Sequence, residues 1–523
     1  DMQDIEFTIE NEQLYILQTR NGKRTANAAI HIAVDLVNEG VISKETAVTN
    51  VEVKSIDQLL HPNFDEAALS KATSISKAGL PASPGASSGK IVFSAEDAKI
   101  QAESGIKVIL MRPETSPEDI EGMISSEAIV TTHGGMTSHA AVVARGMGKC
   151  CVTGCSDLDI NTNEKVVHYP GGKLVEGDVI SVDGTKGDLY IGEVATMKAE
   201  RSEAFNQFMQ WSEEVARLNV RMNAETPQDI EVGYQFGATG IGLVRTEHMF
   251  FGPERLVEMR RFILADSQVS RMAALNKIRG YQAEDFESIL KLSGEKPTII
   301  RLLDPPLHEF LPKSQEEKET VAEQLEVTVL NLEQYIENLE EVNPMLGHRG
   351  CRLAITYPEL YIMQVEAIIN SAIKLKRKGI HTHPEIMIPL VSTVAEFEIL
   401  KQQIVERVEQ LQQESGIAIQ YMIGTMIETP RACLIADQLA KSCDFFSFGT
   451  NDLTQLTFGF SRDDAGKFIN QYAEQGILEI DPFQTLDVDG VGQLIQVAVD
   501  KAKAVNPELK IGVCGELGGD NKS

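Results

Sequence analysis

Short apolar runs alternate with longer amphipathic segments through the C-terminal part of the chain. From residue 218 onwards, eight apolar runs occur at spacings that suit a strand followed by a helix. The runs are Val220–Ala224, Gly240–Arg245, Thr298–Leu303, Met345–Arg349, Ile386–Leu390, Tyr421–Ile427, Phe445–Phe448 and Lys510–Cys514. Eight such units predict a (β/α)8 TIM-type barrel over residues 218–523. Since the sequence ends soon after the eighth run, we expect the eighth helix to be missing and apolar barrel surface to be exposed.

The N-terminal part has a different pattern, in which two strands and one helix precede a boundary. Alternating apolar positions predict strands over Asp4–Glu10 and Leu14–Thr19, and helical periodicity predicts a helix over Ala26–Glu39. Two strands and a helix form a poor independent core, so residues 1–60 are interpreted as an incomplete unit. Residues 61–79 are a predicted linker, because the prolines and glycines that follow mark a domain boundary.

Residues 80–193 mix short apolar strands with helical segments, which predicts a compact α/β domain. The expected strands are Lys90–Phe93, Lys107–Met111, Ala128–Thr132 and Val179–Val182. A charged helical linker over residues 194–217 separates this domain from the barrel. The sequence therefore predicts an α/β multidomain protein whose central domain has a linker on each side.

The charge balance narrows the classes of partner. Against 77 Asp and Glu residues the chain has 48 Lys and Arg residues, for a net charge of −29 at pH 7. Such an acidic chain is not expected to bind nucleic acid or an anionic membrane. No apolar run reaches the roughly 18 residues of a membrane span, and the start lacks the pattern of a secretory signal. We expect a cytoplasmic protein, with a plastid or another organelle left open because the N-terminus is missing.

Seven cysteines are a sparse, odd number for a chain of this length and fit reduced thiols better than a disulfide framework. Cys150, Cys151 and Cys155 stand close together in the sequence, but no second pair of ligands follows at zinc spacing. We interpret these three cysteines as small buried residues, and a metal site is the weaker alternative.

Polar residues follow the predicted barrel strands, where barrel enzymes build their sites. Arg245, Arg301 and Arg349 can hold phosphate or carboxylate through two parallel N–H bonds. Glu428 and Asp452 can bind Mg²⁺ through carboxylate oxygens. Taken singly, each of these groups is better explained as an ion pair or a helix cap. The other polar residues at strand ends are Glu225, Glu247, His248, Asp304, His348, Asn451, Cys514 and Glu516. Together they favour an enzyme, and the charges suit phosphoryl transfer.

A second candidate site lies at the start of an apolar helix. Residues 131–146 place a strand end, two glycines and a Thr/Ser cap before an Ala- and Val-rich helix, with His139 in its first turn. Unpaired N–H groups and the helix dipole would stabilise an anion carried on the imidazole. A neutral histidine is also a competent nucleophile toward phosphorus. The alternative is that His139 only packs or caps.

Residues 134–146, followed by Lys149-Cys-Cys-Val, resemble the phosphohistidine signature of the pyruvate, phosphate dikinase family. Enzyme I of the sugar phosphotransferase system and phosphoenolpyruvate (PEP) synthase differ from it at Met136 or Ser138. Further segments resemble the dikinases in order: 240–251, 301–312, 343–350, 426–431, 449–455 and 512–516. The Asp-Pro-Pro-Leu-His-Glu-Phe stretch in 301–312 separates the dikinases from both relatives. Leu517 stands where some members have His, and this affects no assigned role.

The resemblance implies a swivelling phosphohistidine β/β/α domain and a barrel that binds PEP and pyruvate. His139 would carry the phosphoryl group, and Cys514 would exchange a proton at C3 of the substrate. The implied roles of the others are anion binding for Arg245, Arg301 and Arg349, substrate placement for Gly449, Thr450 and Asn451, and binding of the Mg²⁺ cofactor for Glu428 and Asp452. We expect nearby cationic charge to lower the pKa of the Cys514 thiol. The alternative for Cys514 is a buried core thiol.

Two further assignments depend on the resemblance. Thr137 matches a threonine that a regulatory protein phosphorylates in some dikinases, although it remains primarily a cap candidate. The N-terminal strands resemble the last strands of an ATP-grasp domain, with Glu6 as a candidate magnesium ligand and Gln18 and Arg20 as candidate nucleotide contacts. Since most of that domain is missing, we expect no useful ATP binding by this chain.

The implied reaction of the full-length parent converts ATP, inorganic phosphate and pyruvate reversibly into AMP, diphosphate and PEP. One histidine serving two separated sites requires the domain over residues 80–193 to swing on its linkers. Family members are typically homodimers that pair through the barrel. Three alternatives remain, namely an enzyme I-like PEP–protein phosphotransferase, PEP synthase, and an inert module derived from a dikinase.

Overall fold

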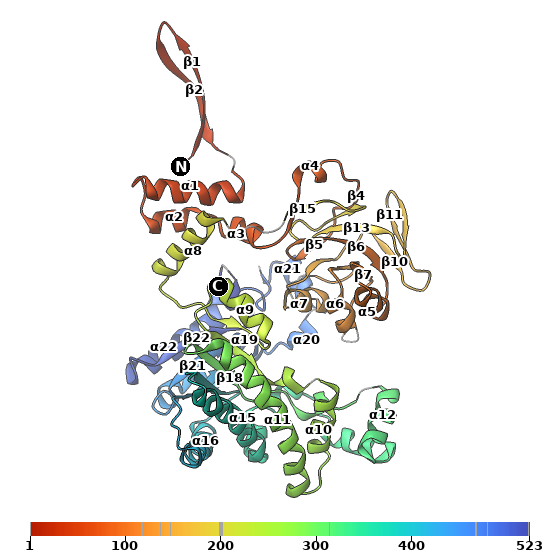
Figure 1. Cartoon of the computed structure of the whole chain (residues 1–523), viewed down its shortest axis with the longest axis vertical. Coiled ribbons are helices and arrows are strands. Elements are labelled where there is room, and N and C mark those ends of the chain that lie inside the picture. Colours follow the sequence, from red (N-terminus) through yellow and green to blue (C-terminus); the bar gives the residue numbers. More distant parts are fainter. Residues whose placement is uncertain are drawn as a thin grey trace. The chain divides into compact units, whose positions relative to one another are not determined.

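The chain forms two compact units, Asp1–Arg217 and Leu218–Ser523, each described here by itself (Figure 1). The computed structural model describes residues 2–22, 24–116, 119–135, 138–146, 148–197, 202–250, 252–312, 314–465, 468–478, 480–520 and 522–523. Within these ranges, no helix combines the length and the apolar content needed to cross a bilayer.

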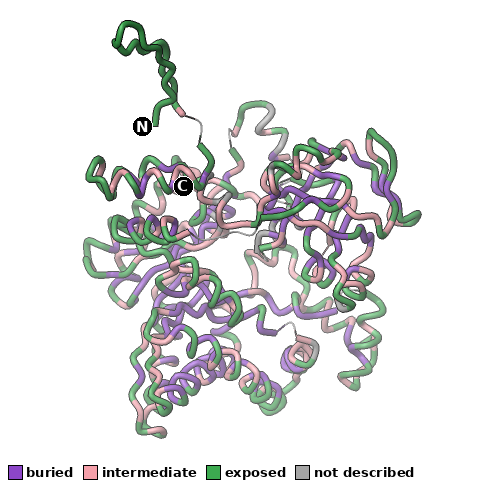
Figure 2. Tube along the Cα trace, turned by 45° about the horizontal axis from the view of Figure 1, so that its top comes forward, coloured by how far each residue is buried: buried purple, intermediate pink, exposed green. Residues whose placement is uncertain are grey.

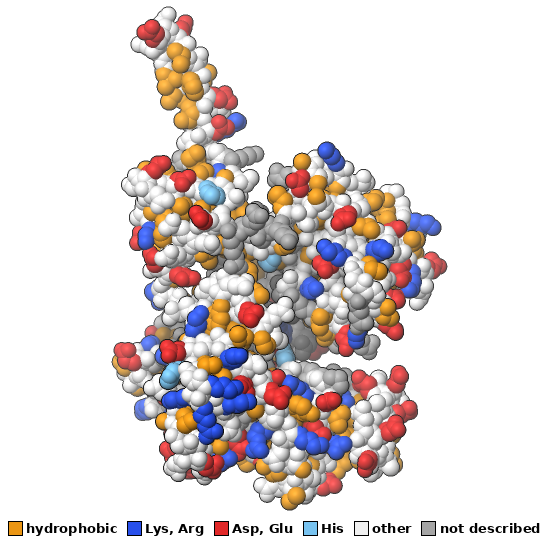
Figure 3. Space-filling model, in the orientation of Figure 1, with side chains coloured by type: hydrophobic (Ala, Val, Ile, Leu, Met, Phe, Trp, Pro, Cys, Tyr) orange, Lys and Arg blue, Asp and Glu red, His pale blue; other side chains and the backbone are white. Residues whose placement is uncertain are grey.

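An antiparallel hairpin of β1 (Gln3–Glu10) and β2 (Gln13–Asn21) begins the first unit. Asn11 and Glu12 connect the strands with φ angles of 49° and 64°, the left-handed geometry that matches the twist of a two-residue hairpin. Every residue of both strands is exposed, as the tube in Figure 2 shows. Apolar side chains gather on the hairpin in Figure 3. They include Ile5, Phe7, Ile9, Leu14, Ile16 and Leu17. The two predicted strands are confirmed.

Four helices form a small apolar cluster after the hairpin: α1 (Ala26–Asn38), α2 (Lys44–Asn50), α3 (Val53–Leu60) and α8 (Glu203–Val215). Thr25, Ser43 and Ser202 cap α1, α2 and α8 by accepting a hydrogen bond from a backbone N–H of the first turn. Phe208 and Trp211 of α8 are buried against Ile30 and its neighbours. Residues 194–217 were expected to be a helical linker. They contain α8, which packs against α1.

An eight-stranded sheet forms the centre of the domain that follows. Its strands, in spatial order, are β4 (Ser74–Ser76), β14 (Asp188–Ile191), β13 (Val179–Asp183), β6 (Ala86–Val92), β7 (Val108–Arg112), β8 (Ala128–Thr131), β9 (Cys150–Thr153) and β5 (Leu80–Ser83). The β6, β7, β8 and β9 strands run parallel. The predicted strands over residues 90–93, 107–111, 128–132 and 179–182 correspond to β6, β7, β8 and β13 and are confirmed, whereas β9 was not predicted. Although residues 61–79 were expected to be a linker, β4 in that segment is an edge strand of the sheet.

Each face of this sheet has its own apolar core. Helices α5 (Ala95–Glu103), α6 (Ile120–Ser125) and α7 (His139–Gly146) pack on one face, with Cys151 among the buried residues. A three-stranded sheet packs on the other face, where Cys150 and Cys155 are buried. Its strands are β10 (Asp159–Asn161), β11 (Val166–Tyr169) and β12 (Gly172–Val175). The expected β/β/α layering is therefore observed, and the three cysteines lie in apolar packing on both sides of the sheet. The remaining short elements are β3 (Asn63–Phe64), which pairs with β15 (Thr196–Met197), and α4 (Glu66–Leu69).

Seven strands form one parallel sheet in the second unit. They are β16 (Met222–Asn223), β17 (Ile241–Arg245), β18 (Pro297–Arg301), β19 (His383–Ile388), β20 (Met422–Ile427), β21 (Phe445–Gly449) and β22 (Lys510–Cys514), and they follow the chain in order. Cα atoms of β22 approach those of β17 within 8 Å, so the sheet curls toward a barrel. Val513 of β22 is 53% exposed, whereas Phe446 and Phe448 of β21 are buried, which agrees with the expected exposed barrel surface.

The prediction of a strand over Met345–Arg349 is wrong. Pro344–Leu346 form a 3-10 turn (η4), and β18 pairs directly with β19, placing Arg301 beside Met387. Pro344 cannot donate to a strand ladder, and Gly350 has a φ of 57° that breaks an extended run. The apolar pair Met345-Leu346 is too short to fix a strand without support from its flanking residues.

Helices surround this sheet and enclose a single large apolar core. The longest are α11 (Gln268–Ser293), α15 (Pro358–Arg377) and α16 (Val394–Ser415), and α15 packs against both of the others. The remaining α-helices are α9 (Pro227–Gln235), α10 (Pro253–Ile263), α12 (Gln315–Leu325), α13 (Val329–Leu339), α14 (Cys351–Thr356), α17 (Pro430–Leu434), α18 (Ala436–Leu439), α19 (Thr450–Phe458), α20 (Arg462–Ala465), α21 (Ile469–Glu474) and α22 (Gln493–Val505). The short 3-10 and π turns are Thr246–Phe250, Leu307–Phe310, Val488–Gly492 and Glu516–Gly519.

Trp211 is the single tryptophan of the chain and is buried, so its fluorescence reports on the four-helix cluster of the first unit. We expect Phe208→Ala to destabilise this cluster by about 3–5 kcal/mol, because it removes a fully buried ring and leaves a cavity. Urea unfolding followed by tryptophan emission measures the change. Asn206→Ala alters an exposed residue of the same helix and should leave the midpoint unchanged. Equal midpoints for the two variants would contradict the packing.

Candidate active site

Charged and polar side chains from five strand ends lie at the carboxyl edge of the parallel sheet. Arg245 ends β17, Arg301 ends β18, and Glu428 follows β20. Thr450, Asn451 and Asp452 begin α19 directly after β21, and Cys514 ends β22. The carboxyl ends of parallel strands lie at one edge of a sheet, which is why residues far apart in the sequence come together here.

A buried network of arginines and carboxylates joins three of these ends. The Arg349 Nη2 donates to Asp304 Oδ2 at 2.5 Å, and its Nη1 donates to Asp452 Oδ1 at 3.2 Å. Arg301 lies 3.1 Å from the same Asp304 oxygen and also pairs with Glu247. Arg349 and Asp304 are each only 3% exposed. Both arginines are therefore fixed by carboxylates from neighbouring strand ends.

The network determines the ionisation of its members. Burial opposes charge on Asp304, but Arg301 and Arg349 outweigh it and hold the pKa of that carboxyl below its usual range. Burial likewise opposes charge on Arg301 and Arg349, and the surrounding carboxylates raise the pKa of both guanidinium groups. Glu247 Oε2, Asp304 Oδ1 and the Nε atoms of Arg301 and Arg349 are buried and accept or donate no hydrogen bond within the described residues. The site therefore holds fixed charges, and these four buried atoms remain able to form a hydrogen bond with a ligand.

Glu428 is the most deeply buried carboxyl at this edge, at 1% exposure. Its Oε1 accepts a hydrogen bond from the Leu390 N–H at 2.5 Å, and Leu390 takes a left-handed φ of 60° to point that N–H inward. Burial first, and then Asp452 and Asp304, raise the pKa of Glu428 well above its ordinary value. A Cβ at Gly449 would lie 2.7 Å from Glu428 Oε2, so only glycine fits beside this carboxyl.

Glu428 and Asp452 fit Mg²⁺. Burial and the neighbouring Asp452 raise the pKa of Glu428, so a cation beside the pair would stabilise its carboxylate form, and Mg²⁺ prefers one or two carboxylates together with substrate oxygens. Across the described ranges, no three His, Cys, Asp or Glu side chains form a cage that could hold a metal without further ligands. A magnesium ion here would need oxygens from a substrate or from water to complete its coordination.

Cys514 is half-buried beside this network. Its Sγ donates to the Phe448 carbonyl at 3.4 Å, and Thr450 Oγ1 donates to the Cys514 carbonyl at 3.0 Å. Burial raises the pKa of the Cys514 thiol, although Ser447 and Arg301 counteract part of the increase. The expectation of a lowered pKa is therefore wrong, because desolvation exceeds the effect of the arginines. Gly515 has a φ of 97°, and a Cβ there would lie 2.6 Å from Thr450 Oγ1.

Arg245 differs from the other two arginines. It is half-buried and makes no ion pair or hydrogen bond with any described residue, yet its charge lowers the pKa of both Asp304 and Cys514. A cationic group that is close to the site but not paired within it is suited to bind an anionic ligand. The neighbouring His248 Nδ1 lies 2.7 Å from Glu225 Oε2, and this contact raises the pKa of His248.

In the first unit, the structure places His139 as the first residue of α7, as the sequence indicated. The Ser138 Oγ accepts a hydrogen bond from the Ala141 N–H at 3.4 Å, which orders the first turn. Gly134 has a φ of 99° in the preceding loop. The side chain of His139 and all of Thr137 lie outside the described residues, so the roles assigned to them stay predictions.

The candidate nucleotide contacts lie on the exposed hairpin. Glu6 of β1 is the register partner of Gln18 of β2, and Arg20 Nε donates to Asp4 at 2.8 Å. The hairpin belongs to the first unit. Its assigned roles stay predictions.

Sequence reasoning missed the importance of Glu247 and Asp304 as partners of the arginines. Both stand among the strand-end residues, and each follows an arginine by two or three positions. That spacing was the available signal, but it could not show that Glu247 pairs with Arg301 or that Asp304 pairs with Arg349 in addition to Arg301.

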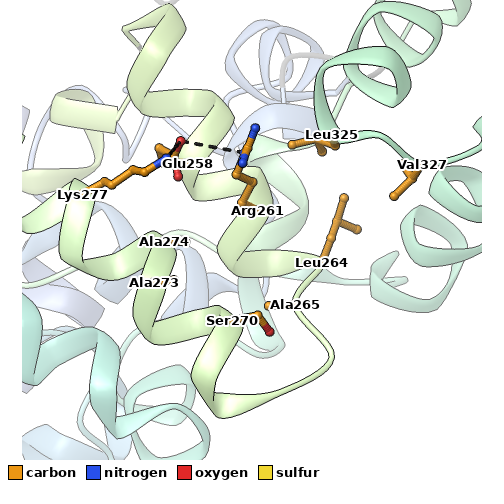
Figure 4. Close-up of a pocket in the computed structure, with 10 residues that line it drawn as sticks. All are labelled: Glu258, Arg261, Leu264, Ala265, Ser270, Ala273, Ala274, Lys277, Leu325 and Val327. Atoms are coloured by element: carbon orange, nitrogen blue, oxygen red, sulfur yellow. Dashed lines mark hydrogen bonds and ion pairs between the residues drawn. The ribbon is translucent and has the colours of Figure 1, made fainter.

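A cavity of about 330 Å³ lies between α10, the start of α11 and residues 325–327 (Figure 4). Its walls are mostly apolar, and Glu258 at one side pairs with Lys277 at 2.9 Å and Arg261 at 3.8 Å. None of the strand-end residues described above lines it. The cavity is therefore separate from the candidate active site.

Asp304→Asn should destabilise the second unit by about 3–5 kcal/mol at pH 7, because it leaves two buried arginines short of a counter-charge. The pKa of Asp304 is lowered in the folded state, so its contribution is complete above the unfolded value of about 3.9 and is lost as the pH falls through the folded value. The difference between the variant and the unchanged chain should be constant from pH 7 to about pH 5 and should shrink in stronger acid. Urea unfolding followed by far-ultraviolet circular dichroism measures it.

Asp437→Asn is the matched control. Asp437 pairs with Lys501 at 3.0 Å but is half-exposed, so its loss should cost under about 1 kcal/mol. An equal cost for the two substitutions would contradict the network's role in stability.

Two protein families and several dikinases are similar to this chain. The family described as "PEP-utilising enzyme, PEP-binding domain" matches residues 199–523, and "PEP-utilising enzyme, mobile domain" matches residues 106–187. The chain is 53% identical to "Pyruvate, phosphate dikinase" of Clostridium symbiosum, 51% identical to that of Rhizobium meliloti (strain 1021), and 49% identical to "Pyruvate, phosphate dikinase 1, chloroplastic" of Arabidopsis thaliana. Each match covers 100% of this chain but 60%, 58% and 54% of the respective relative, so the chain spans little more than half their length. The parallel-stranded unit with its buried arginines, and the β/β/α domain with His139 at a helix start, identify the chain as a member of the PEP-utilising enzyme family.

Proposed function

We propose that this chain carries the PEP and pyruvate half of a pyruvate, phosphate dikinase, together with its shuttle histidine. The observation that supports this most strongly is the edge of the sheet where Arg301 and Arg349 share Asp304 beside Glu428 and Cys514. In the parent protein, ATP, phosphate and pyruvate would give AMP, diphosphate and PEP. The half-reaction here is phosphohistidine plus pyruvate giving histidine plus PEP.

Binding of the anionic substrate is assigned to the three arginines. Arg301 and Arg349 have their planar guanidinium groups held in place by Glu247, Asp304 and Asp452. Such fixed forks suit the paired oxygens of carboxylate and phosphoryl groups. Arg245 has no pairing to give up, so it can bind an oxygen anion without breaking an ion pair. Gly449, Thr450 and Asn451 would place the substrate from the end of β21.

Cys514 is assigned the proton at C3. As thiolate it removes a proton from the methyl group of pyruvate, and the C–H electron pair becomes the C–C double bond of the enolate. The enolate oxygen then forms a bond to phosphorus while the bond from phosphorus to the His139 nitrogen breaks, and its electron pair stays on the imidazole. In reverse, the thiol protonates C3.

Glu428 and Asp452 would hold Mg²⁺, which when bound supplies positive charge to substrate oxygens. The raised pKa of Glu428, which burial, Asp452 and Asp304 cause, supports this assignment, because a nearby cation would stabilise the carboxylate. The left-handed backbone at Leu390 fixes one oxygen of Glu428, so the other can face a ligand.

The shuttle requires His139 to reach the barrel in one step and the nucleotide site in another. His139 begins α7 of the β/β/α domain, directly after Ser138, whose Oγ accepts a hydrogen bond from the Ala141 N–H. We propose that this domain swings on its flanking segments, and that ATP and phosphate are used by a part of the parent beyond the remnant with Glu6, Gln18 and Arg20. Regulation at Thr137, dimer formation through the barrel and a cytoplasmic or plastid location belong to the same proposal.

Incubation with Mg²⁺ and ³²P-labelled PEP should label the chain with an acid-labile, base-stable phosphoryl group that added pyruvate removes. His139→Ala should abolish the label, because the imidazole nitrogen is the acceptor. His133→Ala is the matched control, since it removes an exposed histidine from the preceding loop, and it should retain the label. Labelling of His139→Ala, or none of the unchanged chain, would reject the shuttle role.

Exchange of the pyruvate methyl protons in D₂O, followed by proton NMR, tests Cys514. The exchange should rise about tenfold per pH unit through neutral pH, because the active form is the thiolate and burial places the thiol pKa above its ordinary value of about 8.5. Cys514→Ala should reduce exchange to the uncatalysed rate, whereas Cys433→Ala, at a buried thiol in α17, should not. A pH-independent rate, or full activity of Cys514→Ala, would exclude the thiolate.

A further inference from the structure

The segment that carries Arg349 has no regular secondary structure of its own at that residue. It runs from the end of α13 through the 3-10 turn Pro344–Leu346 to Gly350, which precedes α14. The Arg349 side chain nevertheless needs a fixed position, because it meets Asp304 and Asp452 from two other strand ends. Something outside the strand-end network must therefore hold this backbone.

Two charged side chains hold the same peptide group, the one that joins Gly347 to His348. Both carboxylate oxygens of Glu341 accept a hydrogen bond from the His348 N–H, at 2.9 and 3.0 Å. On the carbonyl side, Arg352 Nη1 donates to the Gly347 oxygen at 2.9 Å and to the Leu346 oxygen at 2.7 Å. Hydrogen bonds with a charged partner are about twice as strong as neutral ones, so this peptide is firmly oriented. The next residue is Arg349.

Gly347 shows how closely the carboxylate sits. A Cβ at this position would lie 1.2 Å from Glu341 Oε2, so glycine is required for Glu341 to reach the backbone. Gly347 has a φ of −96°, so it is not in the left-handed region that favours glycine. Its lack of a side chain leaves the space that the Glu341 carboxylate occupies.

Glu341 acts at a distance from the anion site. It makes no ion pair with Arg349 or with any other arginine among the described residues, and its two oxygens are used on the backbone. Its chemistry is thus directed at the loop and not at a substrate. The side chain is half-buried and lies before the 3-10 turn, so its removal does not open the apolar core.

We propose that Glu341 is a positioning residue for Arg349, with Arg352 as its counterpart on the other side of the Gly347–His348 peptide. This inference rests on the proposed function, in which Arg349 binds an anionic group of PEP. By fixing the peptide before Arg349, the two side chains set where the guanidinium fork stands relative to Asp304 and Asp452. Glu341 itself touches neither the substrate nor the metal.

The test is the dissociation constant of PEP, measured by isothermal titration calorimetry on the 523-residue chain with Mg²⁺ present. Glu341→Ala should weaken PEP binding about tenfold, because a small displacement of a binding group is costly. Whether PEP binding becomes weaker or stronger distinguishes a positional effect from an effect of charge. Removing a negative charge near an anion site should by charge alone strengthen binding, so weaker binding requires a positional effect. Glu341→Gln keeps an acceptor oxygen and should restore most of the affinity.

Three further variants complete the experiment. Glu340→Ala removes the same charge from the adjacent exposed residue and should not weaken binding. Gly347→Ala should imitate Glu341→Ala, because its methyl group displaces the carboxylate. In an Arg349→Lys background, Glu341→Ala should have at most about a twofold effect, since the two residues act as one unit.

The outcomes separate the two proposals. If Arg349→Lys weakens PEP binding but Glu341→Ala does not, or if their effects simply add, the positioning role is wrong and the proposed function stands. Equal weakening by Glu340→Ala would also overturn the inference, because it would show an effect of charge alone. If the unchanged chain binds no PEP, the proposed function fails and this inference fails with it.

Discussion

The buried ion pairs around Asp304 are the interaction on which the second unit depends most. A carboxylate and two guanidinium groups in a place with almost no solvent are costly to bury unless each has a partner in good geometry. Asp304 supplies that partner to Arg301 and Arg349 at once, and Glu247 and Asp452 complete the charge balance. The parallel sheet brings these groups together because its strands all end at one edge. The ion pairs also link the ends of strands that do not hydrogen-bond directly to each other, such as β18 and β21.

The same arrangement links stability with function. An arginine already held by carboxylates loses little freedom when it binds an anion, and this reduces the entropic cost of binding. A buried glutamate with a raised pKa favours a cation beside it, and the left-handed backbone at Leu390 keeps it in place. In the proposed function, a bound anion and a bound cation would compensate these charges. Such a pattern is typical of a site and not of an ordinary core.

Much of this architecture could be predicted from the sequence. The N-terminal hairpin, three of the four parallel strands of the central domain (β6, β7 and β8) and seven of the eight strand segments in the second unit are where the apolar pattern placed them. The segment with Arg349 was misread, because Met345 and Leu346 looked like a strand although Pro344 and Gly350 prevent one. At the site, residue type and position pointed to the arginines and to Glu428. Pairings across the sheet edge, such as Arg349 with Asp452, depend on long-range geometry that a local pattern does not contain. The thiol pKa of Cys514 was misjudged for the same reason, since desolvation is a property of the folded surroundings.

The hairpin at residues 3–21 behaves differently from everything else in the chain. Among the described residues its two strands pair only with each other and cover no core, so their hydrogen bonds open to water with little loss of free energy. Amide hydrogens there should exchange with solvent orders of magnitude faster than those of the parallel sheets. A two-stranded ribbon with both outer edges unpaired is also a template for further strands. The described chain thus combines two units with packed cores and one hairpin whose outer edges could still accept a strand.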